Sequence, residues 1–231
     1  MKLIALGDTH GRRNWEKITA KNDFDRVVFI GDYFDTHEDI SAEQQIDNFK
    51  KIIAFKKANP EKVILLFGNH SFHYLKTIDE QYSGYQRFHA FDIQEALHKA
   101  IDERLLQMCY VSGNYLFSHA GVTQTWCRNN NIDINNIEEQ INDLFLYKPN
   151  SFKFTVGENY DNYGDDICQT PIWVRPRSLV MDRISNYIHV VGHTTQDKLL
   201  IYETAIFIDT LGTSGEYLEI TDGVAKAVKQ R

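Results

Sequence analysis

Short apolar runs recur along the first half of the chain, and each of them ends in a small polar cluster. The runs and their clusters are Lys2–Leu6 before Gly7-Asp8-Thr9-His10, Arg26–Ile30 before Gly31-Asp32, and Lys62–Phe67 before Gly68-Asn69-His70. β-Branched and aromatic residues are frequent in these runs, as is typical of buried strands. The pattern predicts three strands with polar side chains at their carboxyl ends.

Helical patterns lie between and after these runs. Ser41 is a good N-cap, apolar residues recur at helical spacing from Ala42 to Ala58, and Asn59-Pro60 ends the pattern. A second long helix is predicted over Tyr85 to Leu106. Strands that alternate with helices of this length indicate βαβ units in an α/β fold.

The second half of the chain has more strand signals and fewer helical ones. Met108–Val111 and Tyr115–Ser118 flank Ser112-Gly113-Asn114, which predicts a hairpin. Further short strands are expected at Tyr187–Val191, Leu199–Glu203, Ala205–Ile208 and Glu216–Ile220. We therefore predict an α/β protein with a four-layer α/β/β/α sandwich: two central mixed sheets flanked by helices, with antiparallel pairs prevailing in the second sheet. Residues 1–231 are expected to form a single domain.

The segment from Leu144 to Pro171 fits this scheme least well. It is rich in Asn, Asp, Tyr and Gly, and we interpret it as a long irregular excursion. Long loops in compact domains are often functional, but a plain surface insertion explains the composition equally well.

Charge and cysteine content narrow the class of protein only a little. The formal net charge of −7 argues against a protein that coats duplex nucleic acid, while Arg12-Arg13 leaves a local basic patch open. Cys109, Cys127 and Cys168 are far apart and odd in number, which favours a reduced, cytoplasmic compartment.

The opening apolar run is too short for a signal-peptide core and is interpreted as the first strand. No run approaches the roughly 20 apolar residues of a membrane span, so no membrane partner is expected.

Five polar clusters share one composition, in which an apolar strand leads into Asp, Asn or His. They are Gly7-Asp8-Thr9-His10-Gly11, Gly31-Asp32-Tyr33-Phe34-Asp35, Gly68-Asn69-His70, Ser118-His119-Ala120-Gly121 and Gly192-His193-Thr194. Open α/β sheets bind ligands beyond the carboxyl ends of their strands. Imidazole together with carboxylate and amide oxygen suits Mn, Fe and Zn, and the absence of thiolates from the clusters argues against a closed structural zinc site.

Two metal ions explain the number of candidate ligands better than one. The candidates are Asp8, His10, Asp32, Asn69, His119 and His193. Six exceed the three or four protein ligands of a typical single site, and one carboxylate that bridges two ions is a common arrangement in phosphoester-cleaving sites. The sequence therefore predicts two divalent metal ions, with Mn favoured and Fe or Zn as alternatives.

At these residues the chain resembles the calcineurin-like metallophosphoesterases. The series GDTHG, GDYFD, GNH, SHAG and GHT is similar to small bacterial and phage serine/threonine phosphoprotein phosphatases and to related dinucleoside tetraphosphatases. The resemblance extends from Asp8 to about Gly212, and the order of all five motifs is retained. It implies a metal-dependent phosphoric ester hydrolase that uses a metal-bridging hydroxide for in-line attack.

The resemblance also implies a role for each matching residue. Asp8 and His10 would bind the first metal, Asp32 would bridge both, and the second would be bound by Asn69, His119 and His193. His70 would be the general acid that protonates the leaving alkoxide, and Asp35 would orient it. Arg175 in the Trp-Val-Arg segment, together with Asn69, would contact the substrate phosphate.

The chain departs from the family pattern in two places. Members of the family usually have the motifs GDxxDRG and GNHE. Here Thr36 and His37 follow Asp35, and Ser71 follows His70. A phosphate-binding arginine is therefore missing from its usual place. Arg12, Arg13 and His37 are candidate replacements, with Arg177 as an alternate to Arg175.

The remaining residues with chemical potential have no matching motif. His37, His73, His89, His98 and His189 are expected to be exposed or helix-face histidines, and Asp209-Thr210 to be structural. The aromatic residues Tyr82, Tyr85, Tyr160 and Tyr163 could line a base-binding surface, although loop packing is the simpler interpretation.

Three functions remain open. The first is hydrolysis of a phosphomonoester such as a phosphoserine or phosphothreonine protein. The second is hydrolysis of a nucleotide or nucleic-acid phosphoester, for example diadenosine tetraphosphate, which the missing arginine and the aromatic excursion favour. A non-catalytic scaffold is the third, but it predicts eroded ligands, and all six ligands and His70 are present.

Overall fold

The strands form two five-stranded sheets in the computed structural model, which describes residues 1–157, 161 and 163–230. The first sheet has the strand order β10 (Val224–Lys229), β9 (Glu216–Thr221), β1 (Lys2–Leu6), β2 (Arg26–Phe29) and β3 (Val63–Leu65). The second has the order β4 (Cys109–Ser112), β5 (Tyr115–Ser118), β6 (Ile188–Val191), β8 (Ala205–Phe207) and β7 (Leu200–Ile201).

Both sheets are mixed, as expected. In the first sheet β1, β2 and β3 are parallel, while β9 and β10 add antiparallel pairs. The expectation that antiparallel pairs prevail in the second sheet is wrong, because β5, β6 and β8 are parallel neighbours and only the edge strands β4 and β7 are antiparallel. Among its described residues, the chain between β5 and β6 holds three α-helices, and a connection of that length allows the strand to return in the parallel direction.

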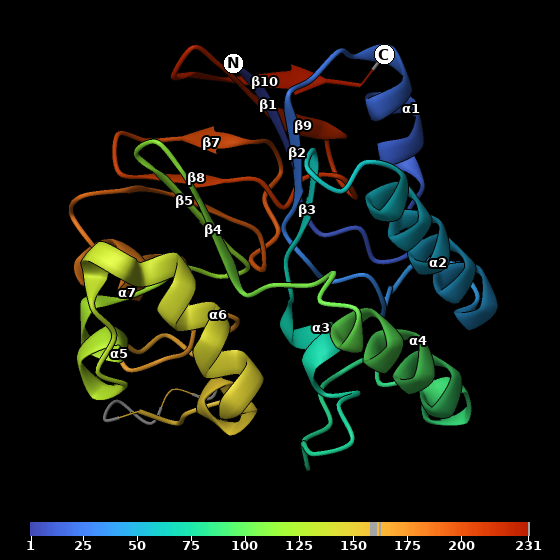
Figure 1. Ribbon diagram of the computed structural model, residues 1–231, viewed down its shortest axis with the longest axis horizontal. Helices are drawn as coiled ribbons and strands as arrows, with labels where there is room; N and C mark the ends of the chain where they lie inside the picture. Colours follow the sequence, from blue (N-terminus) through green and yellow to red (C-terminus); the bar gives the residue numbers. More distant parts are fainter. Residues whose placement is uncertain (158–160, 162, 231) are drawn as a thin grey trace.

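The helices lie in two groups (Figure 1). With the first sheet lie α1 (Asn14–Lys21), α2 (Ala42–Ala58) and α4 (Ala90–Asp102), and with the second lie α5 (Gln124–Asn129), α6 (Ile137–Tyr147) and α7 (Pro176–Met181). The short α3 (Asn69–Phe72) follows β3, and turns of 3₁₀ helix cover Arg87–His89, Ile134–Asn136 and Pro149–Phe152. No helix within the described ranges combines the length and the apolar composition that crossing a membrane would need.

The helix predicted over Ala42–Ala58 is confirmed, and Ser41 forms a capping box with Gln44. The helix predicted from Tyr85 to Leu106 is shorter at both ends. At its start, the Gln86 side chain donates to Asp35 and its backbone N–H donates to the Tyr74 hydroxyl, which holds this part of the chain outside the helix.

The core explains why the strands of the first sheet read as continuous apolar runs. Alternate residues belong to two separate clusters: Ile4 and Leu6 of β1 pack toward the helices, whereas Leu3 and Ala5 pack toward the second sheet. Phe117 of β5 and Val190 of β6 meet them there. Both faces of the first sheet are therefore buried, as the four-layer α/β/β/α prediction requires.

The outer face of the second sheet has a small cluster of its own. Val191 and Phe207 pack there against Leu179 of α7. The irregular excursion is shorter than expected, because Leu144–Tyr147 belong to α6. Beyond it, the buried Gln169 side chain holds Thr155 through two hydrogen bonds, to its backbone N–H and its carbonyl. The described part of the excursion is thus packed onto the domain.

Candidate metal centre

The six predicted metal ligands come together at the carboxyl ends of β1, β2, β3, β5 and β6. They lie at a cleft of about 370 Å³ that His10, Asp32, Asn69 and His193 line directly. Asp8 and His119 lie beneath them and are almost completely buried. Residues from five separate strand ends meet here because parallel strands bring their carboxyl ends to the same edge.

Asp8 and Asp32 are oriented by backbone N–H groups. The N–H of His193 donates to Asp8 Oδ2 at 2.9 Å, and the N–H of His70 donates to Asp32 Oδ1 at 2.9 Å. His10 Nε2 lies 4.0 Å from Asp8 Oδ2 and 4.0 Å from Asp32 Oδ2. These three side chains form the first group of the candidate centre.

The second group surrounds the amide oxygen of Asn69. Asn69 Oδ1 lies 2.9 Å from His119 Nε2 and 3.0 Å from His193 Nδ1. His119 Nε2 is also 3.3 Å from Asp32 Oδ2. The same Asp32 oxygen therefore faces both groups, as a bridging ligand must.

The outer nitrogen of each of the three imidazoles faces a backbone carbonyl. His10 Nδ1 lies 2.7 Å from the Phe34 oxygen, His119 Nδ1 3.1 Å from the Ile30 oxygen, and His193 Nε2 3.1 Å from the Trp173 oxygen. A carbonyl only accepts, so the ring proton is assigned to the outer nitrogen and the inner nitrogen presents a lone pair.

Lone pairs from nitrogen and oxygen consequently converge without a proton between them. Asn69 Oδ1 and Asp32 Oδ2 have no hydrogen to offer either, and Asp8 Oδ1 is buried with no hydrogen-bond partner among the described residues. Such an arrangement is repulsive unless cations occupy it. The residues present therefore fit divalent metal ions.

The local backbone is strained where the ligands sit. Seven non-glycine residues in the described part of the chain have positive φ, and His10, Asp32, Asp35 and His193 are four of them. Strain of this kind clusters at functional sites. Gly68 and Gly192 have a related role, because a Cβ at either would collide with a carboxylate oxygen, of Asp32 and of Asp8 respectively.

Burial and neighbouring charges shift the pKa values of the ligands in opposite directions. Burial raises the pKa of the Asp8 carboxyl well above its ordinary value, and Asp209 adds to the shift. Burial alone would raise the pKa of Asp32 too, but the facing His119 and His70 imidazoles reverse the sign and lower it. Burial lowers the pKa of His10 and lowers that of His193 further, so both rings are neutral and able to coordinate.

His70 projects from α3 beside this centre and is paired with Asp35, as the sequence predicts. His70 Nδ1 lies 3.1 Å from Asp35 Oδ2. Although burial lowers the pKa of His70, the carboxylates of Asp32 and Asp35 outweigh it and raise the pKa. A protonated imidazole next to the candidate metals can donate its proton to a leaving group.

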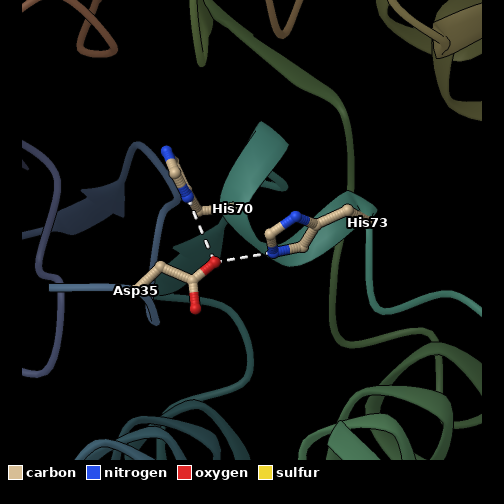
Figure 2. Close-up of side chains that lie close together, drawn as sticks. All are labelled: Asp35, His70 and His73. Atoms are coloured by element: carbon tan, nitrogen blue, oxygen red, sulfur yellow. Dashed lines mark hydrogen bonds and ion pairs between the residues drawn. The ribbon is translucent and has the colours of Figure 1, made fainter. Parts of the chain in front are cut away.

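A second histidine on Asp35 was missed. His73 Nε2 lies 2.6 Å from Asp35 Oδ2 (Figure 2), and its side chain is 0% exposed. The expectation of an exposed or helix-face histidine is therefore wrong for His73, and also for His189, which is fully buried on β6. His73 carries no strand-end motif; its spacing of three from His70 is the only local signal, because it places both rings on one turn of helix.

Of the candidate phosphate-binding residues, Arg12, Arg175 and His37 line the cleft, whereas Arg13 and Arg177 do not. Arg12 is engaged with Glu38, at 2.7 Å from Nε to Oε1. Arg175 donates from Nε to the Tyr163 carbonyl and from Nη1 to the Thr194 hydroxyl. These two bonds use two of the five N–H groups of its guanidinium, which leaves Arg175 better suited than Arg12 to hold a phosphate.

The aromatic residues considered for a base-binding surface, and Asp209, lie in different parts of the structure. Tyr82 lines the cleft together with Trp173, whereas Tyr85 stacks on Tyr74 at a ring distance of 4.7 Å. Tyr163 is largely exposed, and Tyr160 lies outside the described residues. Asp209, which was expected to be structural, lines the cleft and accepts a hydrogen bond from Thr195 at 2.7 Å.

Comparison with known proteins agrees with this architecture. A two-sheet α/β sandwich with a carboxylate, imidazole and amide centre at its strand ends defines a metal-dependent phosphoester hydrolase. Residues 1–195 match the model of the calcineurin-like phosphoesterase family, and the chain belongs to that family. Family members use two divalent metal ions. No curated protein matches the sequence.

Solved structures share the fold at low sequence identity. A serine/threonine phosphatase from Saccharomyces cerevisiae, described as similar to human phosphatase PP5, is 11% identical with a TM-score of 0.61, and the match covers 100% of this chain and 80% of that one. A metallophosphoesterase from Sphaerobacter thermophilus is 11% identical with a TM-score of 0.51, covering 100% and 90%. At such identities the likeness concerns the fold alone.

Proposed function

We propose that the chain is a phosphomonoesterase of the serine/threonine protein phosphatase type with a dinuclear metal centre. The six ligands are Asp8, His10, Asp32, Asn69, His119 and His193. The convergence of unprotonated donors on both sides of Asp32 Oδ2 carries the proposal, because both groups of ligands face this one carboxylate oxygen and would together hold two cations. The nitrogen and oxygen donor set favours manganese, with iron or zinc as alternatives.

Each residue of the cleft then has a chemical task. Metal ions held by these six residues would supply an activated water and would neutralise charge on the phosphoryl oxygens. Arg175 binds the phosphate through its remaining N–H groups, and Asn69 lies where its amide can contact the same group. His70 holds a proton at Nε2 for the leaving oxygen, and Asp35 keeps the ring in place through Nδ1.

Turnover assays with metal reconstitution test this function. Metal-free protein is loaded with Mn, Zn or Fe and assayed on p-nitrophenyl phosphate and on phosphoserine and phosphothreonine peptides. We expect metal-dependent release of inorganic phosphate from both kinds of substrate. A fully loaded protein that hydrolyses no monoester would rule the proposal out.

A nucleotide substrate is the second candidate, and the aromatic residues of the cleft favour it. Tyr82 and Trp173 both line the cleft, with their rings 4.5 Å apart and nearly perpendicular. Aromatic faces there could stack on a base. Chromatography of the products from diadenosine tetraphosphate distinguishes the two, since this candidate requires faster cleavage of the nucleotide than of p-nitrophenyl phosphate.

A further inference from the structure

Two imidazoles contact the same carboxylate oxygen of Asp35. His70 Nδ1 and His73 Nε2 both approach Oδ2, at 3.1 Å and 2.6 Å, and Figure 2 shows them reaching it from different directions. His70 belongs to α3, and His73 caps the carboxyl end of the same helix. One turn of helix therefore presents both rings to the same acceptor.

The ring proton of His73 lies on the nitrogen that faces Asp35. The backbone N–H of Tyr82 donates to His73 Nδ1 at 3.0 Å, so Nδ1 is an acceptor and the ring proton resides on Nε2. The Tyr82 ring also stacks on His73, with centroids 5.0 Å apart and planes 19° from parallel. The orientation of His73 is thus set from the side opposite to Asp35.

The other oxygen of Asp35 is held equally firmly. Asp35 Oδ1 accepts from the Tyr74 hydroxyl at 2.6 Å and from the Gln86 amide at 3.1 Å. With donors on both oxygens, the carboxylate cannot rotate without breaking hydrogen bonds in a buried place, which is costly.

The same three side chains are also close enough to be considered as a cation site. The distance of 2.6 Å between Asp35 Oδ2 and His73 Nε2 is that of a close ion-pair contact and leaves no room for an ion between the two atoms. The Tyr82 N–H assigns a proton to that nitrogen, so the cluster is a proton relay held by direct contact rather than a cation site.

We propose that His73 is a positioning residue for the general acid: it fixes Asp35 Oδ2, and through it the ring of His70. This role rests on the proposed phosphoester hydrolysis and adds a member to its machinery that no motif marks. Without His73 the only contact left on Oδ2 among the described residues is the one to His70 at 3.1 Å, so the carboxylate can turn about its Oδ1 hydrogen bonds and His70 Nε2 is no longer directed at the leaving oxygen.

Two substitutions separate this role from simple packing. In His73→Gln the side-chain nitrogen reaches about as far as Nε2 and can still donate to Asp35. In His73→Asn the side-chain oxygen lies near the position of Nδ1 and can still accept from Tyr82, but the donor to Asp35 is lost. His98→Asn is the matched control, because His98 is half-buried on α4 and bonds only the exposed backbone of Lys76 among the contacts described.

The readout is the ratio of kcat on a phosphoserine peptide to kcat on p-nitrophenyl phosphate. An alkoxide must be protonated as it leaves, whereas p-nitrophenolate is a weak base and leaves unaided. We expect His73→Asn to lower the ratio by about 10-fold or more, and His73→Gln to restore most of it. An unchanged ratio in His73→Asn, or a larger loss in His73→Gln than in His73→Asn, would overturn the proposal.

A second measurement does not depend on turnover. Nitrogen-15 spectra of histidine-labelled, zinc-loaded protein, recorded at a pH where His70 has given up its Nε2 proton, report the tautomer of the neutral ring. We expect one tautomer with the proton on Nδ1 in the wild type, and loss of that single tautomer in His73→Asn. If the wild type hydrolyses no phosphoester the proposed function fails, yet an unaltered His70 tautomer in His73→Asn would still refute the positioning role by itself.

Discussion

Two clusters of carboxylate and imidazole lie side by side in the cleft, and they differ in where the protons are. Around Asp35 donors face acceptors: His70 and Tyr74 donate to the carboxylate, and the protonated nitrogen of His73 lies 2.6 Å from it. Around Asp32 lone pairs face lone pairs, because the outer nitrogens of His10 and His119 donate to carbonyls. The first cluster is complete as it stands, and the second requires cations.

The difference shows that residue type alone does not distinguish a proton relay from a metal centre. Both clusters combine aspartate and histidine, with their nitrogen and oxygen atoms within 4.8 Å of one another. The group on the far side of each ring decides, since a backbone carbonyl behind His119 turns a lone pair inward, whereas a backbone N–H behind His73 turns a proton inward.

Removing the shared carboxylate should have the largest effect. Asp32→Asn keeps the shape but loses the negative charge and one oxygen that faces both groups of ligands. We expect kcat to fall by roughly 10³-fold or more, since metal ions contribute several kcal/mol to such reactions. Metal content, measured by atomic emission, should fall as well.

The exposed Asp23 provides the control for charge. Asp23→Asn makes the same chemical change outside the cleft and should leave both activity and metal content intact. Full metal occupancy and normal turnover in Asp32→Asn would contradict the metal assignment.

Removing the acid of the relay should have a smaller effect of a different kind. His70→Asn leaves all six proposed ligands in place, so metal content should stay at the wild-type level. Loss of general-acid catalysis should lower kcat on phosphoserine peptides by roughly 10²- to 10³-fold. Assays with the phosphopeptide and with p-nitrophenyl phosphate should show the smaller loss on the latter; equal losses on both would argue against an acid role.

Removing the metal should lower the free energy of unfolding only in proteins whose metal ligands are intact. At a Mn concentration of about 100 times Kd, binding to the folded state alone adds roughly 2.7 kcal/mol to the free energy of unfolding. Thermal unfolding with and without EDTA should show this gain in the wild type and in His73→Asn. It should be lost in His119→Ala, and a gain that persists there would place the metal elsewhere.

Much of the fold and of the metal centre could be predicted because both follow from local patterns. The apolar runs end in polar clusters at Asp8, Asp32 and Asn69, and the carboxyl ends of parallel strands meet at one edge. The helix after Ser41 could be predicted for the same reason, since the residues that favour its first and last turns lie next to it in the sequence.

The features that were missed depend on distant contacts. His73 is functional only because Asp35 and the Tyr82 backbone lie on either side of its ring, and nothing in its own neighbourhood indicates them. The parallel pairing of β5 with β6 follows from the long connection between them, which short strand signals do not reveal. Strand β10 escaped notice because it is an edge strand with mostly exposed residues.

The smallest expected effect concerns His189, a buried imidazole that belongs to neither cluster. Its ring nitrogens have no hydrogen-bond partner among the described residues, and burial lowers its pKa to about 4. Above about pH 6.5, the ordinary value, His189 is neutral in both the folded and the unfolded chain. As the pH falls toward 4 only the unfolded chain takes up the proton, so the free energy of unfolding decreases in that window.

Removing the imidazole should therefore flatten the pH dependence of stability. For a shift of this size, His189 accounts for about 2 kcal/mol of the stability lost between pH 7 and pH 5. Urea unfolding of His189→Leu at the two pH values, with EDTA present throughout, should show a loss smaller by about that amount. His37→Leu, at an exposed position, controls for the removal of a histidine. An equal loss in the wild type and His189→Leu would mean that burial without a partner does not hold this ring neutral, and that a proton can reach an imidazole in the core as readily as one at the surface.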